Sequence, residues 1–273
     1  MTDPFIIMCA PNGARRGKSD HANIPLTPTE IADCAEEVLA AGASILHLHV
    51  RDEAGGHSLS VRRYQDAISA VRARVGDKLV IQATSEAVGR YSRDQQMEMV
   101  KLLKPEAVSL ALREICPGPA DEASTTAFFS WIEASRIFPQ IILYDEKDVG
   151  KFEYLRQQGV FCQQRPFVLC VLGKYGSSNG ETLSDLQQFA DVLSPVQVPW
   201  AACSFGAAEH GLAAKTLQYG GHVRVGFENN LHRRDGGLAD NNAELVAGAY
   251  SVARDAGYSA ATADDVRQML MQR

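Results

Sequence analysis

The chain has 273 residues, of which 45% are hydrophobic and 22% charged, and its formal net charge is −6. A chain of this length can bury a large core, either as one α/β barrel of about 250 residues or as two smaller domains. The acidic balance and the lack of a basic stripe argue against nucleic acid as the main partner, because few cations are available to neutralise phosphates.

The cysteines indicate a reducing compartment, since none forms a C-x-x-C pair and several lie inside apolar segments. Met1-Thr-Asp-Pro leads directly into an apolar segment, without the basic and apolar regions of a secretion signal. No apolar run approaches the roughly 20 residues that span a membrane. We therefore expect a soluble, cytoplasmic protein with no membrane partner. The cysteines are Cys9, Cys34, Cys116, Cys162, Cys170 and Cys203.

Short apolar segments alternate with longer amphipathic ones along the whole chain. The first helix is signalled most clearly, by a capping Thr27, Pro28 at the first helical position and Glu30 three residues after the cap. The predicted strands cover 5–10, 44–50, 79–83, 107–111, 140–143, 167–172, 197–202 and 222–227. The predicted helices cover 27–41, 61–75, 93–103, 124–138, 146–158, 182–193, 207–218 and 241–256, with a terminal helix over 263–271.

Eight strand–helix repeats predict the α/β class and a (β/α)8 TIM barrel. We expect a single domain over residues 1–273, with the terminal helix as an addition to the barrel. The competing layout is a doubly wound open sheet, which favours a glycine-rich turn after the first strand. Pro11-Asn12-Gly13-Ala14 is not a G-x-G-x-x-G turn, so the barrel is favoured.

Two histidines in one apolar segment are the strongest sign of chemistry. His47 and His49 are two positions apart, so in a strand both side chains point to the same face. Arg224 and Glu228 share a face of the eighth predicted strand, which only the first strand separates from the second in a closed barrel. Barrel active sites gather at the carboxyl ends of the strands, so His47, His49 and Glu228 are expected to converge as metal ligands. The alternative is that both histidines are ordinary hydrogen-bonded core residues.

These segments resemble the β-keto acid cleavage enzyme family, which includes 3-keto-5-aminohexanoate cleavage enzyme. The resemblance implies a zinc-dependent (β/α)8 barrel that forms homotetramers, with zinc held by His47, His49 and Glu228. It also implies a reaction that condenses a β-keto acid with acetyl-CoA and cleaves the adduct to acetoacetate and a new acyl-CoA. The segments that carry it are Cys9-Ala-Pro-Asn-Gly-Ala14, Pro25-Leu-Thr-Pro28, Ala41-Gly-Ala43, His47-Leu-His49-Val-Arg-Asp52, Val171-Leu-Gly173, Gly220-Gly-His-Val-Arg-Val-Gly-Phe-Glu228 and Asn241.

The chain departs from the family pattern at the catalytic base. The family usually follows its ligand glutamate with an aspartate of the base machinery, whereas this chain has Asn229, an amide that cannot accept a proton at neutral pH. Arg224 is retained, and Thr84 stands where the family commonly has serine. Glu86 and Glu114 follow the third and fourth strands and are candidate replacements for the base. The alternative is that both glutamates are solvated loop residues or partners of arginines.

Substrate recognition is expected around the turn after the first strand. Arg15 replaces the glutamate that meets the ammonium group in the aminohexanoate enzyme, which favours an anionic or polar tail unless Arg15 points into solvent. Asn12, Arg51 and Arg113 are further candidates for binding the substrate.

Glycines after the sixth strand are candidates for binding the CoA phosphates. Gly173 and Gly176 lie in a loop that offers backbone N–H groups to phosphates, although the loop can equally be a turn or lid. The remaining histidines lack this strand-end placement, and we expect surface or capping positions for them. They are His21, His57, His210 and His232.

Two other functions fit the same residues. One is a CoA-independent, metal-dependent carbon–carbon lyase or hydrolase on the same barrel. The other is a barrel that holds a metal and binds a small acid without turnover, because Asn229 replaces the base. The same ligands also suit divalent metals other than zinc.

Overall fold

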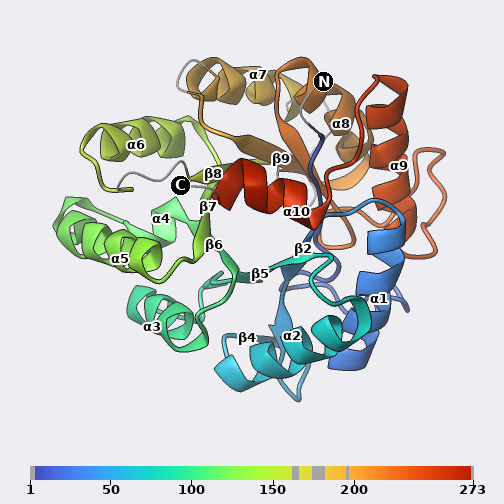
Figure 1. Cartoon of the computed structure of the whole chain (residues 1–273), viewed down its shortest axis with the longest axis horizontal. Helices are drawn as coiled ribbons and strands as arrows, with labels where there is room; N and C mark the ends of the chain where they lie inside the picture. Colours follow the sequence, from blue (N-terminus) through green and yellow to red (C-terminus); the bar gives the residue numbers. More distant parts are fainter. Residues whose placement is uncertain (1–3, 162–165, 174–181, 195–196, 272–273) are drawn as a thin grey trace.

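Eight parallel strands form a closed barrel in the computed structural model (Figure 1), which describes residues 4–161, 166–173, 182–194 and 197–271. Each strand pairs with the next barrel strand along the chain, and the last strand closes on the first. The (β/α)8 barrel is therefore confirmed. The barrel strands are β1 (Ile7–Cys9), β2 (Ile45–Leu48), β5 (Val80–Thr84), β6 (Ala107–Ala111), β7 (Phe138–Leu143), β8 (Phe167–Leu172), β9 (Trp200–Ser204) and β10 (His222–Val225).

Helices follow the strands and surround the barrel (Figure 1). The first begins where the sequence predicts, since Thr27 and Glu30 cap each other's backbone N–H groups in a capping box. The long helices are α1 (Pro28–Ala40), α2 (Val61–Val75), α3 (Arg93–Leu103), α5 (Glu122–Ala134), α6 (Glu146–Gln157), α7 (Thr182–Leu193), α8 (Glu209–Gln218) and α9 (Asn242–Asp255). Shorter elements are the hairpin of β3 (Val50–Arg51) and β4 (His57–Ser58), the helix α4 (Leu112–Ile115), and the 3-10 turns η1 (Pro119–Asp121) and η2 (Gly206–Ala208).

Several element boundaries differ from the sequence prediction, and backbone conformation explains them. The helix predicted over 124–138 ends at Ala134, because Arg136 has a left-handed φ of 58°. Strand β7 then begins at Phe138, which pairs with β6. The strand predicted from residue 197 begins at Trp200, since Gln197 also has a positive φ, 53°. The eighth strand ends at Val225, before a turn at Gly226.

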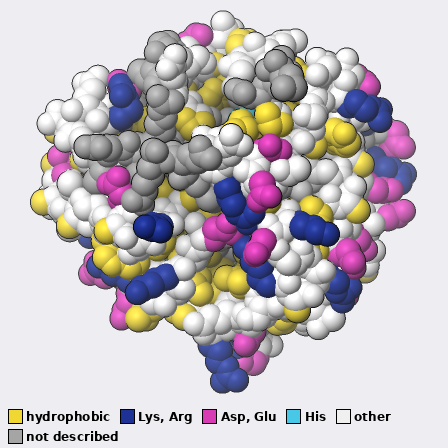
Figure 2. Space-filling model, in the orientation of Figure 1, with side chains coloured by type: hydrophobic (Ala, Val, Ile, Leu, Met, Phe, Trp, Pro, Cys, Tyr) yellow, Lys and Arg dark blue, Asp and Glu magenta, His cyan; other side chains and the backbone are white. Residues whose placement is uncertain are grey.

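The C-terminal segment closes the end of the barrel where the strands begin. Helix α10 (Ala263–Val266) and the short π-helix η3 (Arg267–Met271) run across the front of the barrel in Figure 1. Val266 and Leu270 pack into the barrel interior with Phe138 and Phe167. Acidic and basic side chains are interspersed over this face (Figure 2), and one ion pair, 2.8 Å from Arg267 Nε to Glu106 Oε1, ties η3 to the segment before β6. The side chains buried at this end are mainly apolar. Polar chemistry is therefore expected at the opposite end, where the strands finish.

In the described part of the chain, no helix is both long and apolar enough to cross a membrane. The cysteines there are buried and free of disulfide bonds, in agreement with the prediction, and Cys162 lies outside the described residues. The described cysteines are Cys9, Cys34, Cys116, Cys170 and Cys203.

Candidate metal centre and its pocket

Three ligand-type side chains converge at the carboxyl ends of β2 and β10. The Nε2 atoms of His47 and His49 lie 3.2 Å apart. Glu228 Oε2 lies 3.7 Å from Nε2 of His47 and 3.2 Å from Nε2 of His49. Within the described residues, this is the group of at least three His, Cys, Asp or Glu side chains close enough to share a metal ion. The three side chains converge as the sequence predicts, and their role as metal ligands stays a prediction.

The spacing of the three donor atoms suits a tetrahedral ion. Bonds of about 2.0–2.2 Å in tetrahedral geometry place donor atoms about 3.4 Å apart, close to all three observed separations. Gln82 Oε1 lies 2.7 Å from Nδ1 of His47. Because an amide oxygen only accepts, that Nδ1 carries the hydrogen and the lone pair lies on Nε2, facing Glu228. The residues present therefore fit a divalent metal.

The ionisation of the cluster also matches a metal site. Burial lowers the pKa of His47 to about 3, so the ring is neutral at neutral pH. Burial alone would raise the pKa of Glu228, but Arg224 and the two histidines hold it well below its ordinary value. Arg224 Nη2 lies 2.8 Å from Glu228 Oε1. The neutral imidazole of His47 and the ionised carboxylate of Glu228 are the forms that bind metal without first releasing protons.

The turn after β1 is shaped around Glu228. Gly13 has a φ of 60°, and a Cβ atom there would lie 2.6 Å from Glu228 Cγ. Asn12 Nδ2 donates to the carbonyl of His49 at 3.1 Å. Arg51 Nη2 donates to the carbonyl of Gly13 at 2.6 Å. Asn12 and Arg51, expected to bind substrate, thus hold the backbone around the candidate metal ligands and lie outside the pocket lining.

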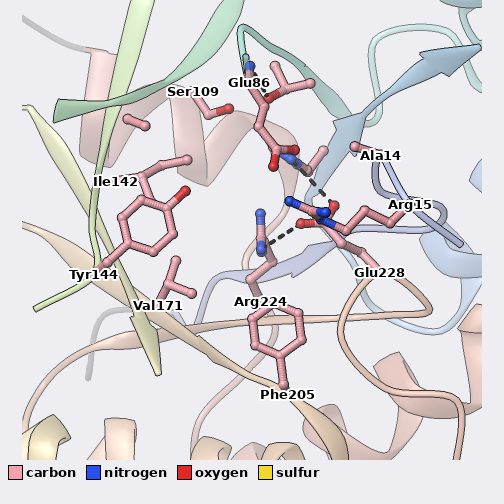
Figure 3. A pocket seen from close by; sticks show the side chains of 13 residues that line it. Ala14, Arg15, Glu86, Ser109, Ile142, Tyr144, Val171, Phe205, Arg224 and Glu228 are labelled. Carbon is pink, nitrogen blue, oxygen red and sulfur yellow. Dashed lines mark hydrogen bonds and ion pairs between the residues drawn. The ribbon is translucent and has the colours of Figure 1, made fainter. Parts of the chain in front are cut away.

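A pocket of about 560 Å³, including space open to solvent, adjoins the cluster. Polar groups gather near Glu228, and an apolar wall from β6 to β9 stands opposite (Figure 3). Its lining residues are Ala14, Arg15, His47, Thr84, Glu86, Ser109, Ala111, Ile142, Tyr144, Val171, Phe205, Arg224 and Glu228.

The structure brings several predicted residues into this pocket. Arg15, Thr84, Glu86 and Arg224 all line it, and in Figure 3 the side chains of Glu86, Arg15 and Arg224 gather around Glu228. Glu86 Oε2 lies 3.9 Å from Nε2 of His49. Burial raises the pKa of Glu86 above its ordinary value. Thr84 Oγ1 accepts the backbone N–H of Glu86 at 3.1 Å, which fixes the turn after β5.

Other predicted residues lie outside the pocket lining. Glu114 Oε2 accepts the backbone N–H of Ala87 at 3.1 Å. Arg113 pairs with Asp145 and Asp148 at 2.7 and 2.6 Å. Gly173 is exposed directly after β8, and Gly176 lies outside the described residues.

Asn229 is fully buried and directly follows Glu228 in the chain. Its Oδ1 accepts from Arg224 Nη2 at 3.3 Å, and its backbone carbonyl accepts from Gly206 and Arg16. Its amide therefore supports Arg224 and is not among the groups that line the pocket.

The surface or capping position expected for His57 is wrong. This histidine is 4% exposed and lies behind His49, on β4. Burial and the neighbouring His49 lower the pKa of His57 to about 3. His21 is buried and so not at the surface, but it matches the capping alternative, since its Nδ1 accepts the backbone N–H of Asn23 at 3.1 Å and its Nε2 lies 2.8 Å from the carbonyl oxygen of Ala239. His232 is exposed as expected, and His210 is half-buried.

Sequence reasoning also missed residues that shape the site. Ser109, Tyr144 and Phe205 line the pocket. Tyr144 and Phe205 lie just beyond the carboxyl ends of β7 and β9, a signal that the barrel rule offers, whereas Ser109 lies in the middle of β6. Glu209 is buried at the start of α8 and accepts from the backbone N–H of Gly226 and from Asn230 Nδ2, both at 3.1 Å. Burial raises the pKa of Glu209 to about 8. It holds the turn that presents Glu228.

The fold and the site together define a class: (β/α)8 barrels with a candidate metal centre and a small-molecule pocket at the carboxyl ends of the strands. The beta-keto acid cleavage enzyme family matches residues 4–271. The chain belongs to this family, and the resemblance read from its motifs is confirmed.

Individual relatives span nearly the whole chain. The 3-keto-5-aminohexanoate cleavage enzyme of Fusobacterium nucleatum is 32% identical over 276 residues, covering 99% of this chain and 98% of that protein. The 3-oxoadipate:acetyl-CoA acetyltransferase of Cupriavidus necator is 25% identical, covering 99% and 95%. A solved complex of ObcA with oxaloacetate is similar in fold, with a TM-score of 0.76 at 15% identity over 91% of this chain and 67% of that one.

Proposed function

We propose that the protein is a zinc-dependent β-keto acid cleavage enzyme that uses acetyl-CoA and releases acetoacetate and a new acyl-CoA. The observation that carries this proposal is the His47–His49–Glu228 cluster at the edge of a pocket that also contains Arg224 and Glu86. Relatives named as acetyl-CoA-dependent transferases of keto acids support the co-substrate.

The proposed reaction balances without any oxidant or reductant. The β-keto acid loses a proton from the carbon between its carbonyl and carboxylate, and that carbon bonds to the acetyl carbonyl as the CoA thiolate leaves. The thiolate then adds to the original ketone carbon. The bond between that carbon and the former nucleophile breaks, and a proton returns to the released acetoacetate. Each turnover therefore needs a group that takes up and returns a proton.

The donor set favours zinc, because two imidazoles and one carboxylate leave a coordination position open. A metal held there supplies a Lewis acid that stabilises negative charge developing on substrate oxygens. Arg224 keeps Glu228 ionised and oriented by their 2.8 Å ion pair. Gln82 holds the ring of His47 in the orientation that faces Glu228.

Glu86 is the best-placed group to move the proton. Of the two carboxylates among the described lining residues, Glu228 belongs to the metal cluster and Glu86 does not. Asn229 is an amide engaged with Arg224, and Glu114 is engaged with a backbone N–H outside the pocket lining. The geometry therefore supports Glu86 in the role that the family usually gives to the aspartate after its ligand glutamate.

The reaction is tested by incubating zinc-loaded protein with acetyl-CoA and a panel of β-keto acids that carry dicarboxylic, neutral or amino-substituted tails. Mass spectrometry should detect a new acyl-CoA together with acetoacetate. Cleavage without acetyl-CoA would instead identify a CoA-independent lyase. Thermal stabilisation by panel members with no product from any of them would identify a binding protein.

Arg15 is expected to make a dicarboxylic tail the preferred one within this panel. It lines the pocket beside Ala14, and the relative from Cupriavidus necator is named for 3-oxoadipate, a dicarboxylic β-keto acid. A charge-assisted hydrogen bond to the tail contributes about 1.5–3 kcal/mol, so Arg15→Gln should lower kcat/KM for dicarboxylic substrates about 10- to 100-fold. Neutral-tailed substrates serve as the control, and an equal loss for both classes would contradict tail recognition.

A further inference from the structure

A third histidine, outside the predicted ligand set, stands behind the metal centre. His57 lies on the hairpin of β3 and β4 and is buried between His49 and the turn that carries Glu86. We propose that His57 is a positioning residue that selects the tautomer of His49 and orders it as a metal ligand. The proposal rests on the metal centre of the proposed function, but it concerns hydrogen bonds that exist without the metal.

A hydrogen bond to the backbone fixes the tautomer of His57. Its Nε2 lies 2.8 Å from the backbone carbonyl oxygen of Glu86. A carbonyl oxygen only accepts, so Nε2 of His57 carries a hydrogen. In a neutral ring the other nitrogen, Nδ1, then has a lone pair and acts as an acceptor.

The tautomer of His57 determines the tautomer of His49. The Nδ1 atoms of His57 and His49 face each other at 3.5 Å, with the ring planes tilted by 58°. Two lone pairs facing each other would repel, so Nδ1 of His49 carries the hydrogen and donates it to His57. The lone pair of His49 then lies on Nε2, the atom that faces His47 Nε2 and Glu228 Oε2. Gln82 selects the same tautomer for His47.

Contacts between protein groups hold His57 in place independently of any metal. The carbonyl of His57 accepts from Arg90 Nη1 at 2.8 Å, and the backbone N–H of Gly56 donates to Asp52 Oδ1 at 2.8 Å. Arg90 and Asp52 also pair with each other at 3.0 Å. The hairpin backbone at His57 is therefore held by contacts that involve no metal. The imidazole keeps its position and can orient His49 and the backbone of Glu86.

Nitrogen-15 NMR of histidine side chains tests the tautomers directly in the wild-type chain. We expect His57 as the Nε2–H tautomer and His49 as the Nδ1–H tautomer, in the metal-free protein and with zinc bound. An Nδ1–H tautomer for His57, or an Nε2–H tautomer for His49 without metal, would overturn the proposal. This readout needs no variant to fold and no activity.

Metal affinity, measured by competition with a chromogenic chelator, tests the consequence. His57→Leu should weaken zinc binding about 10- to 100-fold, the usual loss when the partner of a ligating histidine is removed. His57→Gln should stay within about threefold of wild type, because its amide both donates and accepts. His222→Leu is the control, a half-buried histidine at the other end of the barrel whose Nδ1 accepts from the Ile6 N–H.

The outcomes separate the two proposals. If the wild-type chain binds no zinc, the proposed metal centre is overturned, and NMR still tests the tautomers. A wild-type chain that binds zinc, with His57→Leu binding equally well, overturns the role of His57. Equal weakening in His57→Leu and His57→Gln would also overturn it, since space-filling alone would then explain the loss.

Discussion

We expect the Glu228→Gln variant to lose its metal and, with it, turnover. Glu228 is the anionic member of the cluster, and an amide in its place offers only a neutral oxygen to the ion. The change also removes the carboxylate that Arg224 meets at 2.8 Å in the barrel interior. Loss of a residue that only supports a ligand typically lowers metal affinity by up to about 100-fold. Loss of Glu228 should lower zinc affinity further.

Stability must be measured alongside metal content, because a buried arginine left without its carboxylate costs about 3–5 kcal/mol in unfolding free energy. Chelator competition gives the affinity, and thermal unfolding of metal-free protein gives the separate effect on the fold. Glu114→Gln is the matched control, since an amide oxygen can still accept the Ala87 N–H that Glu114 now accepts. Zinc binding by Glu228→Gln at wild-type affinity would contradict the assignment of this ligand.

The barrel and the ligand cluster could be predicted because both follow from regular repetition. Alternating apolar segments fix the order of strands and helices, and the closed barrel then places the second and eighth strands one strand apart. His49 lies one residue beyond the end of β2, yet it remains on the face that His47 occupies. The i, i+2 rule therefore held past the last strand residue.

The supporting residues could not be predicted, because short irregular segments carry no periodicity. His57 lies in a two-residue strand, and its approach to His49 depends on how the hairpin folds back. Asn12 and Arg51 looked like groups available to a substrate. They are instead engaged with backbone carbonyls, which must be satisfied where the chain turns inside the fold.

The sequence could not distinguish Glu86 from Glu114 as the candidate base, because both follow barrel strands. Helix α4 begins directly after β6, and Glu114, within that helix, reaches the backbone of Ala87. Glu86 instead sits in a turn that Thr84 caps, and its side chain lines the pocket. Local backbone geometry after each strand decides which carboxylate enters the site.

Glu86→Gln is expected to slow proton transfer strongly while leaving the metal in place. A positioned general base contributes about 10²- to 10⁴-fold to rate, so kcat should fall within that range. Glu86 Oε2 is 3.9 Å from Nε2 of His49, outside the three-residue cluster, so zinc affinity should change little. Exchange of the substrate C2 proton with deuterated water, followed by NMR without acetyl-CoA, isolates this step from condensation.

Two variants show whether the effect belongs to Glu86 itself. Glu114→Gln makes the same chemical change at a carboxylate outside the pocket lining and should exchange at the wild-type rate. Asn229→Asp combined with Glu86→Gln should not restore exchange, because residue 229 is buried against Arg224 and does not line the pocket. Full rescue by that aspartate would contradict the argument that position 229 cannot reach the substrate. Unchanged exchange in Glu86→Gln alone would contradict the assignment of Glu86 as the base, because Asn229 cannot take the proton in its place. Loss of zinc from Glu86→Gln would instead make Glu86 a fourth ligand.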